Sequence, residues 1–519
     1  MTLPPPTEWP VDNPLGDRSP DLLRLRAEST PDGTALVDAD EGTELTYETF
    51  DRRVSGLAAA LSDQYGVGGG RIGVLLGTRQ AFAQLYFAVG RLGGSVVALN
   101  VELPADRLRT QVERADVELL VCGSQTEELA HTIATADVPV ASVEEPTNPA
   151  IDTLEATETD DNPATEADLD TEGLVLFTSG TAGEPKGVRL TRRNLVASGA
   201  ASAHRLGVDP ADRWLVCLPM YHMGGLAPLL RSTLYGTTTV VQREFGHDAT
   251  ARVLEEYDVT GVSLVPTMLT RLIDAGWEPN DPLRFVLLGG APASRELIER
   301  CAARDVPVYP TYGMTETASQ VATATPEEAR AHPGTVGTPL RGTSVSVLGG
   351  DGTATEPGTT GELVVDGPTV TPGYLDAEQT ADAFDDDGFH TGDLGYADES
   401  GRLWVVGRVD DAIVTGGENV HPTRVADALQ DLPGVADAAV FGLPDDEWGE
   451  RVAALVVPAG APAGSPSLTA DQVRESVRDR LATYAVPKTI GFADQIPRTH
   501  SGTIDREAVR DRLLTAQRE

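Results

Sequence analysis

Lysine is nearly absent from this sequence of 519 residues, which contains only Lys186 and Lys488. Lys and Arg together number 40 against 80 Asp and Glu, which gives a formal net charge of −40. Because such an acidic chain has no concentrated basic patch, we do not expect nucleic acid as a partner. Hydrophobic residues still make up 40%, so the charge does not indicate disorder. It favours a carboxylate-rich surface that stays hydrated at very high salt, a halophilic trait, over an acidic binding surface.

Cysteines and long apolar runs are also scarce. Cys122, Cys217 and Cys301 cannot form a paired framework and do not have metal-ligand spacing, which predicts a reduced, cytoplasmic setting. No stretch approaches the roughly 18 apolar residues of a membrane-spanning helix, so we expect no membrane insertion. The first 17 residues have no positive region and no apolar run, which predicts that they are not a signal peptide. The oligomeric state stays open, with a homo-oligomer among the alternatives.

Apolar runs alternate with helix-length segments from about residue 20 to residue 320. Runs at 71–77, 213–219, 237–242, 261–266 and 284–290 predict parallel strands covered on both faces. After residue 335, short strands and Gly turns predict a β-rich subdomain that reaches residue 409. From about residue 410 the pattern predicts a compact α+β segment, with helices near 422–432, 470–483 and 505–517. The expected fold is therefore α/β, with a large domain over 1–409 and a small one over 410–519.

The clearest local motif follows the apolar strand Leu174–Phe177. Glycines let the backbone turn tightly and direct N–H groups at phosphate oxygens, while hydroxyls and one lysine add donors and positive charge. An ordinary surface turn would also contain Gly, Ser and Thr, but one of the two lysines of the chain lies here. We therefore predict a phosphate-binding loop formed by Thr178, Ser179, Gly180, Thr181, Gly183 and Lys186.

Three further segments that contain recognisable motifs follow the loop along the chain. They are Tyr312–Thr317 (YGMTET), Thr391–Asp393 (TGD), and Gly407–Asp411 (GRVDD) with the Gly416–Asn419 sequence (GGEN) after it. With the loop, they resemble the adenylate-forming superfamily of acyl-CoA synthetases, luciferases and peptide-synthetase adenylation domains. The resemblance covers nearly the whole chain. It implies a large N-terminal domain of stacked αβαβα sheets and a small, mobile C-terminal domain.

The resemblance also implies a two-step reaction. A carboxylate attacks the α-phosphorus of ATP and releases pyrophosphate, and the thiol of coenzyme A then displaces AMP from the acyl-adenylate. In this scheme Lys186, Glu316 and Arg408 are catalytic, Glu316 and Thr181 hold Mg²⁺, and Asp410 is the hinge. Beyond the loop, the implied nucleotide-binding residues are Ala291, Thr311, Tyr312, Gly313, Met314, Thr315, Asp393 and Arg408.

The acid is indicated by three segments, 218–245, 287–294 and 308–329. They are most similar to o-succinylbenzoate–CoA ligases of menaquinone synthesis, whose substrate keeps a second, aromatic carboxylate. A buried charge of this kind needs a cationic partner. Arg231 lies in an otherwise apolar helical run, so periodicity alone favours a position on the helix surface, whereas the resemblance favours a carboxylate clamp. His222 either lines the acyl pocket or packs at a strand end. Gly289, Gly290 and Ala291 are expected to form a thin wall where the substrate and the adenine approach the backbone closely.

One segment departs from the superfamily pattern P-[KR]-T-x-S-G-K. Thr503 stands where the adenylation lysine is expected, and a neutral hydroxyl cannot replace an ammonium. Arg498, His500 and Lys488 are nearby cations that could take over this role. Two alternatives therefore stay open: a CoA ligase for another aryl or short-chain acid, and a non-catalytic protein that binds nucleotide or acyl-adenylate.

Overall fold

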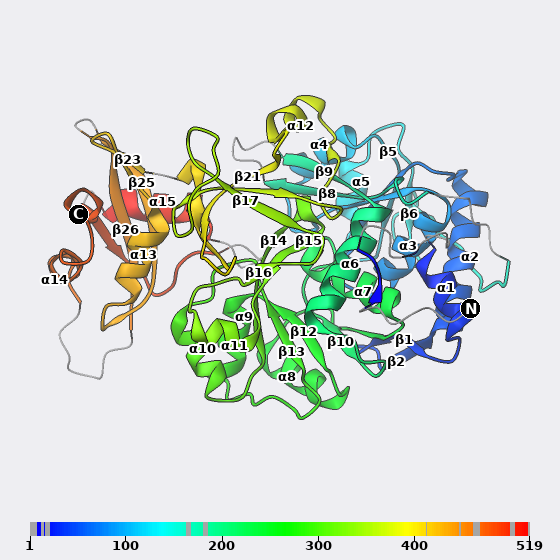
Figure 1. Cartoon of the computed structure of the whole chain (residues 1–519). Coiled ribbons are helices and arrows are strands. Elements are labelled where there is room, and N and C mark those ends of the chain that lie inside the picture. The colour runs from blue at the N-terminus through cyan, green and yellow to red at the C-terminus, as the bar shows by residue number, and fades with distance from the viewer. Residues whose placement is uncertain are drawn as a thin grey trace. The chain divides into compact units, whose positions relative to one another are not determined.

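The apolar runs form two large sheets in the computed structural model of the chain (Figure 1). The structure describes residues 8–11, 15, 21–161, 168–179, 185–411, 413–445, 448–459, 468–498 and 504–516. By its internal contacts the chain divides into two compact units, one of Met1–Val345 with Val365–Phe389 and one of Ser346–Val364 with His390–Glu519. The expected domain boundary at residues 409 and 410 stays a prediction.

The nine-stranded sheet has a parallel centre and antiparallel edges, and its order is β16-β15-β14-β13-β12-β10-β11-β1-β2. Its strands are β1 (Thr34–Asp38), β2 (Thr43–Thr46), β10 (Arg213–Val216), β11 (Thr238–Val241), β12 (Gly261–Leu264), β13 (Phe285–Leu288), β14 (Val308–Met314), β15 (Ser319–Thr323) and β16 (Thr338–Pro339). The runs predicted at 213–219, 237–242, 261–266 and 284–290 are confirmed as its central strands.

The eight-stranded sheet follows the same plan, in the order β19-β9-β8-β4-β3-β5-β6-β7. Its strands are β3 (Arg71–Leu75), β4 (Ser95–Ala98), β5 (Val117–Cys122), β6 (Val140–Ser142), β7 (Asp152–Thr153), β8 (Glu172–Ser179), β9 (Pro185–Thr191) and β19 (Gly373–Tyr374). Its centre is parallel, and β8, β9 and β19 pair antiparallel. The strand predicted at 71–77 is confirmed as β3.

Helices fill the space between the two sheets and cover their outer faces. One core joins strands of both sheets with α2 (Tyr47–Tyr65), α3 (Gln80–Arg91) and α7 (Met223–Tyr235), and α6 (Arg192–Leu206) packs on α7. The outer helices are α4 (Ala105–Arg114) and α5 (Glu127–Ile133) on the eight-stranded sheet, and α8 (His247–Glu256), α9 (Pro266–Asp274) and α10 (Arg295–Ala302) on the other. The predicted stack of αβαβα layers is confirmed.

A smaller sheet is built from β17 (Ser344–Leu348), β18 (Gly361–Asp366), β20 (Phe384–Asp385), β21 (Gly388–Ala397) and β22 (Leu403–Arg408). These strands account for most of the predicted β-rich stretch. Two short strands differ from the prediction, because β16 and β19 extend the large sheets. The stretch also contains one helix, α12 (Ala377–Ala383).

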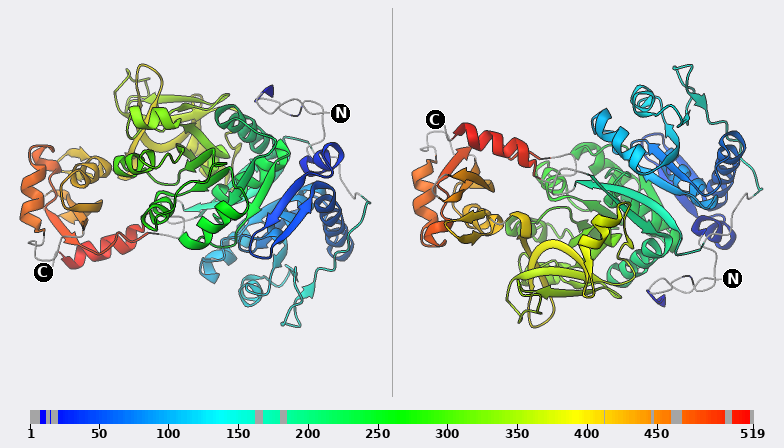
Figure 2. Two further views of the ribbon diagram at one scale, coloured as in Figure 1. Left: turned by 90° about the horizontal axis from the view of Figure 1, so that it is seen from below. Right: turned by 90° about the horizontal axis from the view of Figure 1, so that it is seen from above.

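The C-terminal segment is a five-stranded sheet with helices on both faces. Its strands are β23 (Ile413–Thr415), β24 (Glu418–Val420), β25 (Val435–Asp445), β26 (Gly449–Pro458) and β27 (Thr489–Phe492). Helices α13 (Pro422–Gln430) and α14 (Ala470–Val477) pack on one face, and α15 (Arg506–Ala516) lies along the other, as both views of Figure 2 show. The three predicted helices are confirmed, although α14 ends before the predicted residue 483. None of the described helices is long and apolar enough to cross a membrane.

Candidate active site

The two ends of the predicted phosphate loop lie side by side. Strands β8 and β9 pair antiparallel, with Thr178 opposite Lys186. Gly180, Thr181 and Gly183 lie outside the described residues. Antiparallel pairing therefore fixes the lysine next to the strand that enters the loop.

Tyr374 links the predicted phosphate lysine to the predicted metal carboxylate. Its strand β19 pairs with β9, which brings the ring within 5.0 Å of Lys186 Nζ, close enough for a cation–π contact. The Tyr374 hydroxyl donates a hydrogen bond to Glu316 Oε1 at 3.1 Å. The backbone N–H of Thr371 also donates to the Glu316 carbonyl at 2.7 Å. Sequence reasoning missed Tyr374 because no local motif marks it; strand pairing alone brings it to Lys186.

The predicted nucleotide segment runs along β14 into a tight turn. Gly313 has no room for a side chain, since a Cβ there would lie 1.7 Å from the Ser319 carbonyl oxygen. Glycine therefore lets β14 and β15 approach closely next to Glu316. On the neighbouring strand end, a Cβ at Gly289 would lie 2.8 Å from Thr311 Cγ2. Of the predicted thin wall, Gly289 thus lies directly against the nucleotide segment, and Gly290 turns the chain with φ of +77°.

Arg231 is buried between helices instead of lying on a helix surface, so the expectation from periodicity alone is wrong. Its exposed fraction is 2%, because α6 and Trp214 cover this side of α7. One guanidinium nitrogen, Nη2, donates to Ser198 Oγ at 3.3 Å, and the group lies 5.6 Å from the Trp214 ring. Nε has no hydrogen-bond partner among the described residues. Burial lowers the pKa of Arg231 to about 10, which reflects the cost of holding an unpaired charge inside the protein.

A small cavity of about 10 Å³ lies beside Arg231. Apart from Ser198 and Arg231, its lining is apolar and consists of Leu195, Met223, Ala227, Leu230 and Ala318. It has room for about one water molecule. An aromatic acid therefore needs side chains to move before it can reach the guanidinium, and Met223 is the adaptable member of the lining.

His222 stands at the N-terminal end of α7, with its ring 4.9 Å from that of Tyr221. It is partly buried, and burial lowers the pKa of its imidazole. The ring is therefore neutral at pH 7. Neutrality suits a side chain that lines an acyl pocket, because it adds no buried charge there, although His222 is not among the residues that line the cavity beside Arg231.

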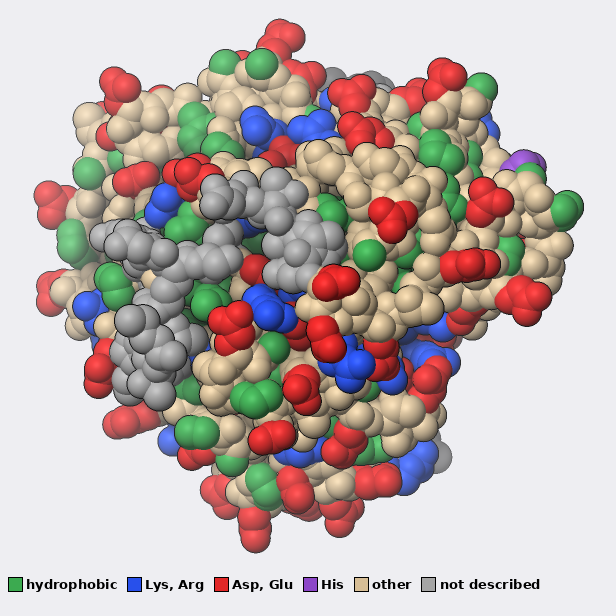
Figure 3. Space-filling view, turned by 90° about the vertical axis from the view of Figure 1, so that its right-hand side faces the viewer, with side chains coloured by type: hydrophobic (Ala, Val, Ile, Leu, Met, Phe, Trp, Pro, Cys, Tyr) green, Lys and Arg blue, Asp and Glu red, His purple; other side chains and the backbone are tan. Residues whose placement is uncertain are grey.

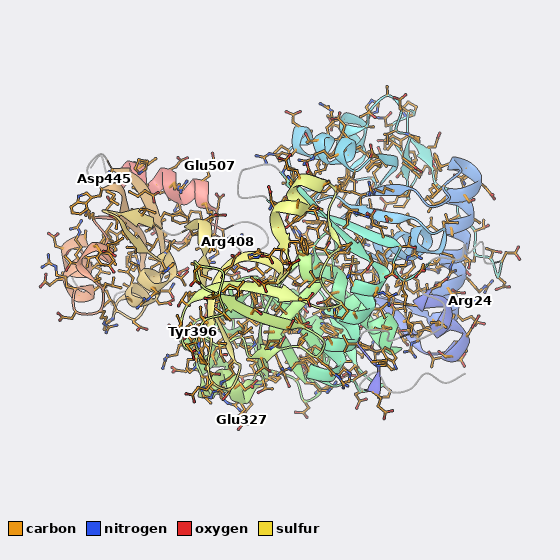
Figure 4. The ribbon with its side chains drawn as sticks, turned by 45° about the horizontal axis from the view of Figure 1, so that its top comes forward. Arg24, Glu327, Tyr396, Arg408, Asp445 and Glu507 are labelled. Carbon is orange, nitrogen blue, oxygen red and sulfur yellow. The ribbon has the colours of Figure 1, made fainter. Side chains whose placement is uncertain are left out.

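Asp393 and Arg408 lie side by side on two neighbouring strands of the smaller sheet. Their positions are paired in β21 and β22, and Arg408 Nη1 lies 3.0 Å from Asp393 Oδ1. Gly392 has φ of +68° and a Cβ there would lie 2.9 Å from Arg408 Nη2, so glycine admits the guanidinium. Arg408 Nε has no hydrogen-bond partner among the described residues. Figure 4 labels Arg408 together with Tyr396 of the same sheet.

Two of the predicted C-terminal cations, Lys488 and Arg498, contact other side chains. Lys488 Nζ lies 3.7 Å from the centre of the Trp448 ring, and Arg498 forms an ion pair with Asp437 at 3.0 Å. His500 and Thr503 lie outside the described residues. Lys488 and Arg498 therefore each have a partner in this structure, and their part in adenylate formation stays a prediction.

The residues around Glu316 fit a magnesium ion that arrives with nucleotide. No group of three or more His, Cys, Asp or Glu side chains suited to a metal occurs in the described part of the chain. Mg²⁺ commonly takes one or two carboxylates and completes its shell with phosphate oxygens and water. Glu316 can supply such a carboxylate.

Comparison with known proteins shows that the chain is an AMP-forming ligase. Residues 23–375 match the family of AMP-binding enzymes, and residues 424–503 match the AMP-binding enzyme C-terminal domain. The chain belongs to the AMP-binding enzyme family. The predicted resemblance to adenylate-forming enzymes is thereby confirmed.

Individual relatives match over nearly their whole length. The 2-succinylbenzoate–CoA ligase of Bacillus licheniformis is 36% identical over 489 residues, which are 94% of this chain and 98% of the relative. A solved o-succinylbenzoate CoA synthetase from Bacillus subtilis, in complex with its acyl-adenylate intermediate, has a TM-score of 0.85 at 31% identity and covers 95% of this chain and 98% of its own. ATP-bound MatB from Rhodopseudomonas palustris has a TM-score of 0.85 at 27% identity, with 95% and 99% covered.

Proposed function

We propose that this chain ligates o-succinylbenzoate to coenzyme A through an acyl-adenylate, with consumption of ATP, as a step of menaquinone synthesis. Arg231 supports this choice of substrate. Its guanidinium is buried beside an otherwise apolar cavity and has no carboxylate partner among the described residues. The aromatic carboxylate of the acid supplies the missing negative charge. The similarity to 2-succinylbenzoate–CoA ligases supports the same acid.

In the first half-reaction the protein positions the reactants and neutralises charge. Lys186 would contact phosphate oxygens. Glu316, held by Tyr374, and the hydroxyl of Thr181 would hold the Mg²⁺ that arrives with ATP. Asp393 accepts hydrogen bonds from the ribose hydroxyls, and Arg408 contacts the nucleotide. Magnesium supplies Lewis-acid stabilisation of the phosphate charge when it is bound.

Coenzyme A enters in the second half-reaction, in which its thiol displaces AMP. Asp410 is exposed in the turn Val409–Asp411 between β22 and β23, which supports its role as a hinge. A rotation of the segment 410–519 about this turn would let one site serve both half-reactions.

The cellular setting is part of the proposal. The three cysteines are free and buried, which supports a reducing cytoplasm. Figure 3 shows carboxylates spread over the visible face with fewer basic groups between them, which supports adaptation to high salt.

Pyrophosphate release tests the function directly. In molar KCl, ATP and o-succinylbenzoate should give faster release than other aryl or short-chain acids, and CoA should then yield AMP and the thioester. Lys186→Ala and Glu316→Ala should each slow adenylate formation by about 10²-fold. The matched control is Glu327→Ala, which removes an exposed carboxylate on α11 (Pro326–Ala331) and should behave as wild type (Figure 4). Faster release with another acid than with o-succinylbenzoate, or no release with any acid, would contradict the proposal.

A further inference from the structure

A buried chain of contacts connects Arg231 with the turn that carries Glu316. Arg231 Nη2 donates to Ser198 Oγ at 3.3 Å, and Ser198 Oγ donates to the Ala318 carbonyl at 2.7 Å. Arg231, Ser198 and Ala318 are 2%, 3% and 0% exposed, so bulk water does not compete for these groups. A hydroxyl has one proton to donate and two lone pairs that accept, and Ser198 uses both functions here.

The turn reached by Ser198 has an unusual backbone. Ala318 and Ser319 adopt φ of +51° and +112°, a region that side-chain-bearing residues rarely occupy. Such residues keep these conformations only where surrounding contacts hold them, and they concentrate at functional sites. Ser198 holds the carbonyl of Ala318, two residues after Glu316. Its hydroxyl is therefore placed to influence where the Glu316 carboxylate lies.

We propose that Ser198 is a positioning residue that couples binding of the second carboxylate of the acid to binding of magnesium ATP. The proposal rests on the proposed function, because it needs a carboxylate at Arg231. A carboxylate can take hydrogen bonds from Nε and one Nη2 proton of a guanidinium in parallel. The other Nη2 proton remains directed at Ser198. Occupation of the acid site thus fixes the guanidinium, the hydroxyl and the turn together.

The expected consequence is reciprocal: the acid tightens magnesium ATP, and magnesium ATP tightens the acid by the same factor. Couplings between sites commonly amount to about fivefold or more. A monocarboxylic analogue, 4-oxo-4-phenylbutanoate, lacks the aromatic carboxylate. It should therefore bind without tightening the nucleotide.

Binding titrations of the full chain with the magnesium complex of α,β-methylene ATP, which cannot release pyrophosphate, measure this coupling. In wild type, saturating o-succinylbenzoate should lower the Kd of the nucleotide about fivefold or more, and in Ser198→Ala the ratio should fall to near one. Ser198→Thr keeps the hydroxyl, so it should retain the coupling. The matched control is Ser202→Ala, a buried serine one turn further along α6, which should keep the wild-type ratio.

Several results would overturn the proposal. The first is an unchanged ratio of nucleotide Kd values in Ser198→Ala, and the second is an equal loss of this ratio in Ser202→Ala. The third is a nucleotide Kd that the monocarboxylic analogue lowers as much as o-succinylbenzoate does in wild type. If wild type does not release pyrophosphate with o-succinylbenzoate, the proposed function fails and this inference fails with it. If wild type is active but shows no coupling, only the inference fails.

Discussion

Replacement of Arg231 by methionine should stabilise the protein while it removes recognition of the acid. The guanidinium is buried, and in the described structure it has one hydrogen bond, to Ser198, and an aromatic neighbour, Trp214. This setting favours a role of Arg231 in ligand binding over a role in stabilising the fold. Arg231→Met keeps most of the volume and has no charge to desolvate.

The magnitude follows from the burial of the charge. A pKa lowered from 12.5 to about 10 corresponds to a desolvation cost of about 3 kcal/mol. The hydrogen bond and the cation–π contact offset about 1–2 kcal/mol of this cost. Removal of the charge should therefore raise the free energy of unfolding by about 1–2 kcal/mol, and the apparent Tm by about 1–4 °C. The same change should lower kcat/KM for o-succinylbenzoate by about 30-fold or more, because a buried charge contact commonly contributes 2 kcal/mol or more.

Arg26 of α1 (Leu22–Ser29) offers a matched control with the opposite expectation. Burial also lowers the pKa of this guanidinium, but it donates to the carbonyl oxygens of Thr233 and Leu234 at the end of α7. Arg26→Met would leave these buried carbonyls without their donor. It should destabilise the protein by about 1–3 kcal/mol.

Thermal unfolding in molar KCl and steady-state kinetics check both variants. 4-Oxo-4-phenylbutanoate serves as the second substrate, since it has no aromatic carboxylate to lose contact with Arg231. A fall in Tm for Arg231→Met would refute the view that the charge is unpaired in the free protein. Equal losses on both acids would refute the clamp.

Three further predictions concern Tyr374, the excess of carboxylates and Thr503. Tyr374→Phe removes the hydroxyl that holds Glu316, so adenylate formation should slow by about tenfold and need more Mg²⁺; an unchanged magnesium requirement would contradict this role. The Tm should rise from low to molar KCl, because screening relieves repulsion among the excess carboxylates; a constant Tm would count against the high-salt interpretation. Thr503→Lys should speed single-turnover adenylate formation without affecting thiol transfer, whereas Lys488→Ala and Arg498→Ala should be no slower than wild type, since these cations have other partners. A slower alanine variant would identify that residue as the substitute for the missing lysine.

Local sequence determined the elements and the order of the nucleotide segments. Apolar runs such as 71–77 and 261–266 form central strands. Their consecutive side chains point to both faces of the sheet, and both faces are buried there because helices cover them. The glycines at 313 and 392 were also marked by sequence, since their segments need close approaches that a side chain would block. The superfamily resemblance, carried by short contiguous motifs, supplied the class of reaction.

Tertiary structure decided which distant side chains meet. The burial of Arg231 could not be deduced from helix periodicity, because it depends on the packing of α6 and Trp214 against one side of α7. The place of Tyr374 beside Lys186 depends on the pairing of β19 with β9, between segments almost 190 residues apart in sequence. Likewise, the contacts of Lys488 with Trp448 and of Arg498 with Asp437 depend on the fold and could not be deduced from the local sequence. The sequence of one helix or strand predicts which of its faces is buried. Whether a buried charge has a partner depends on the other elements that pack against it.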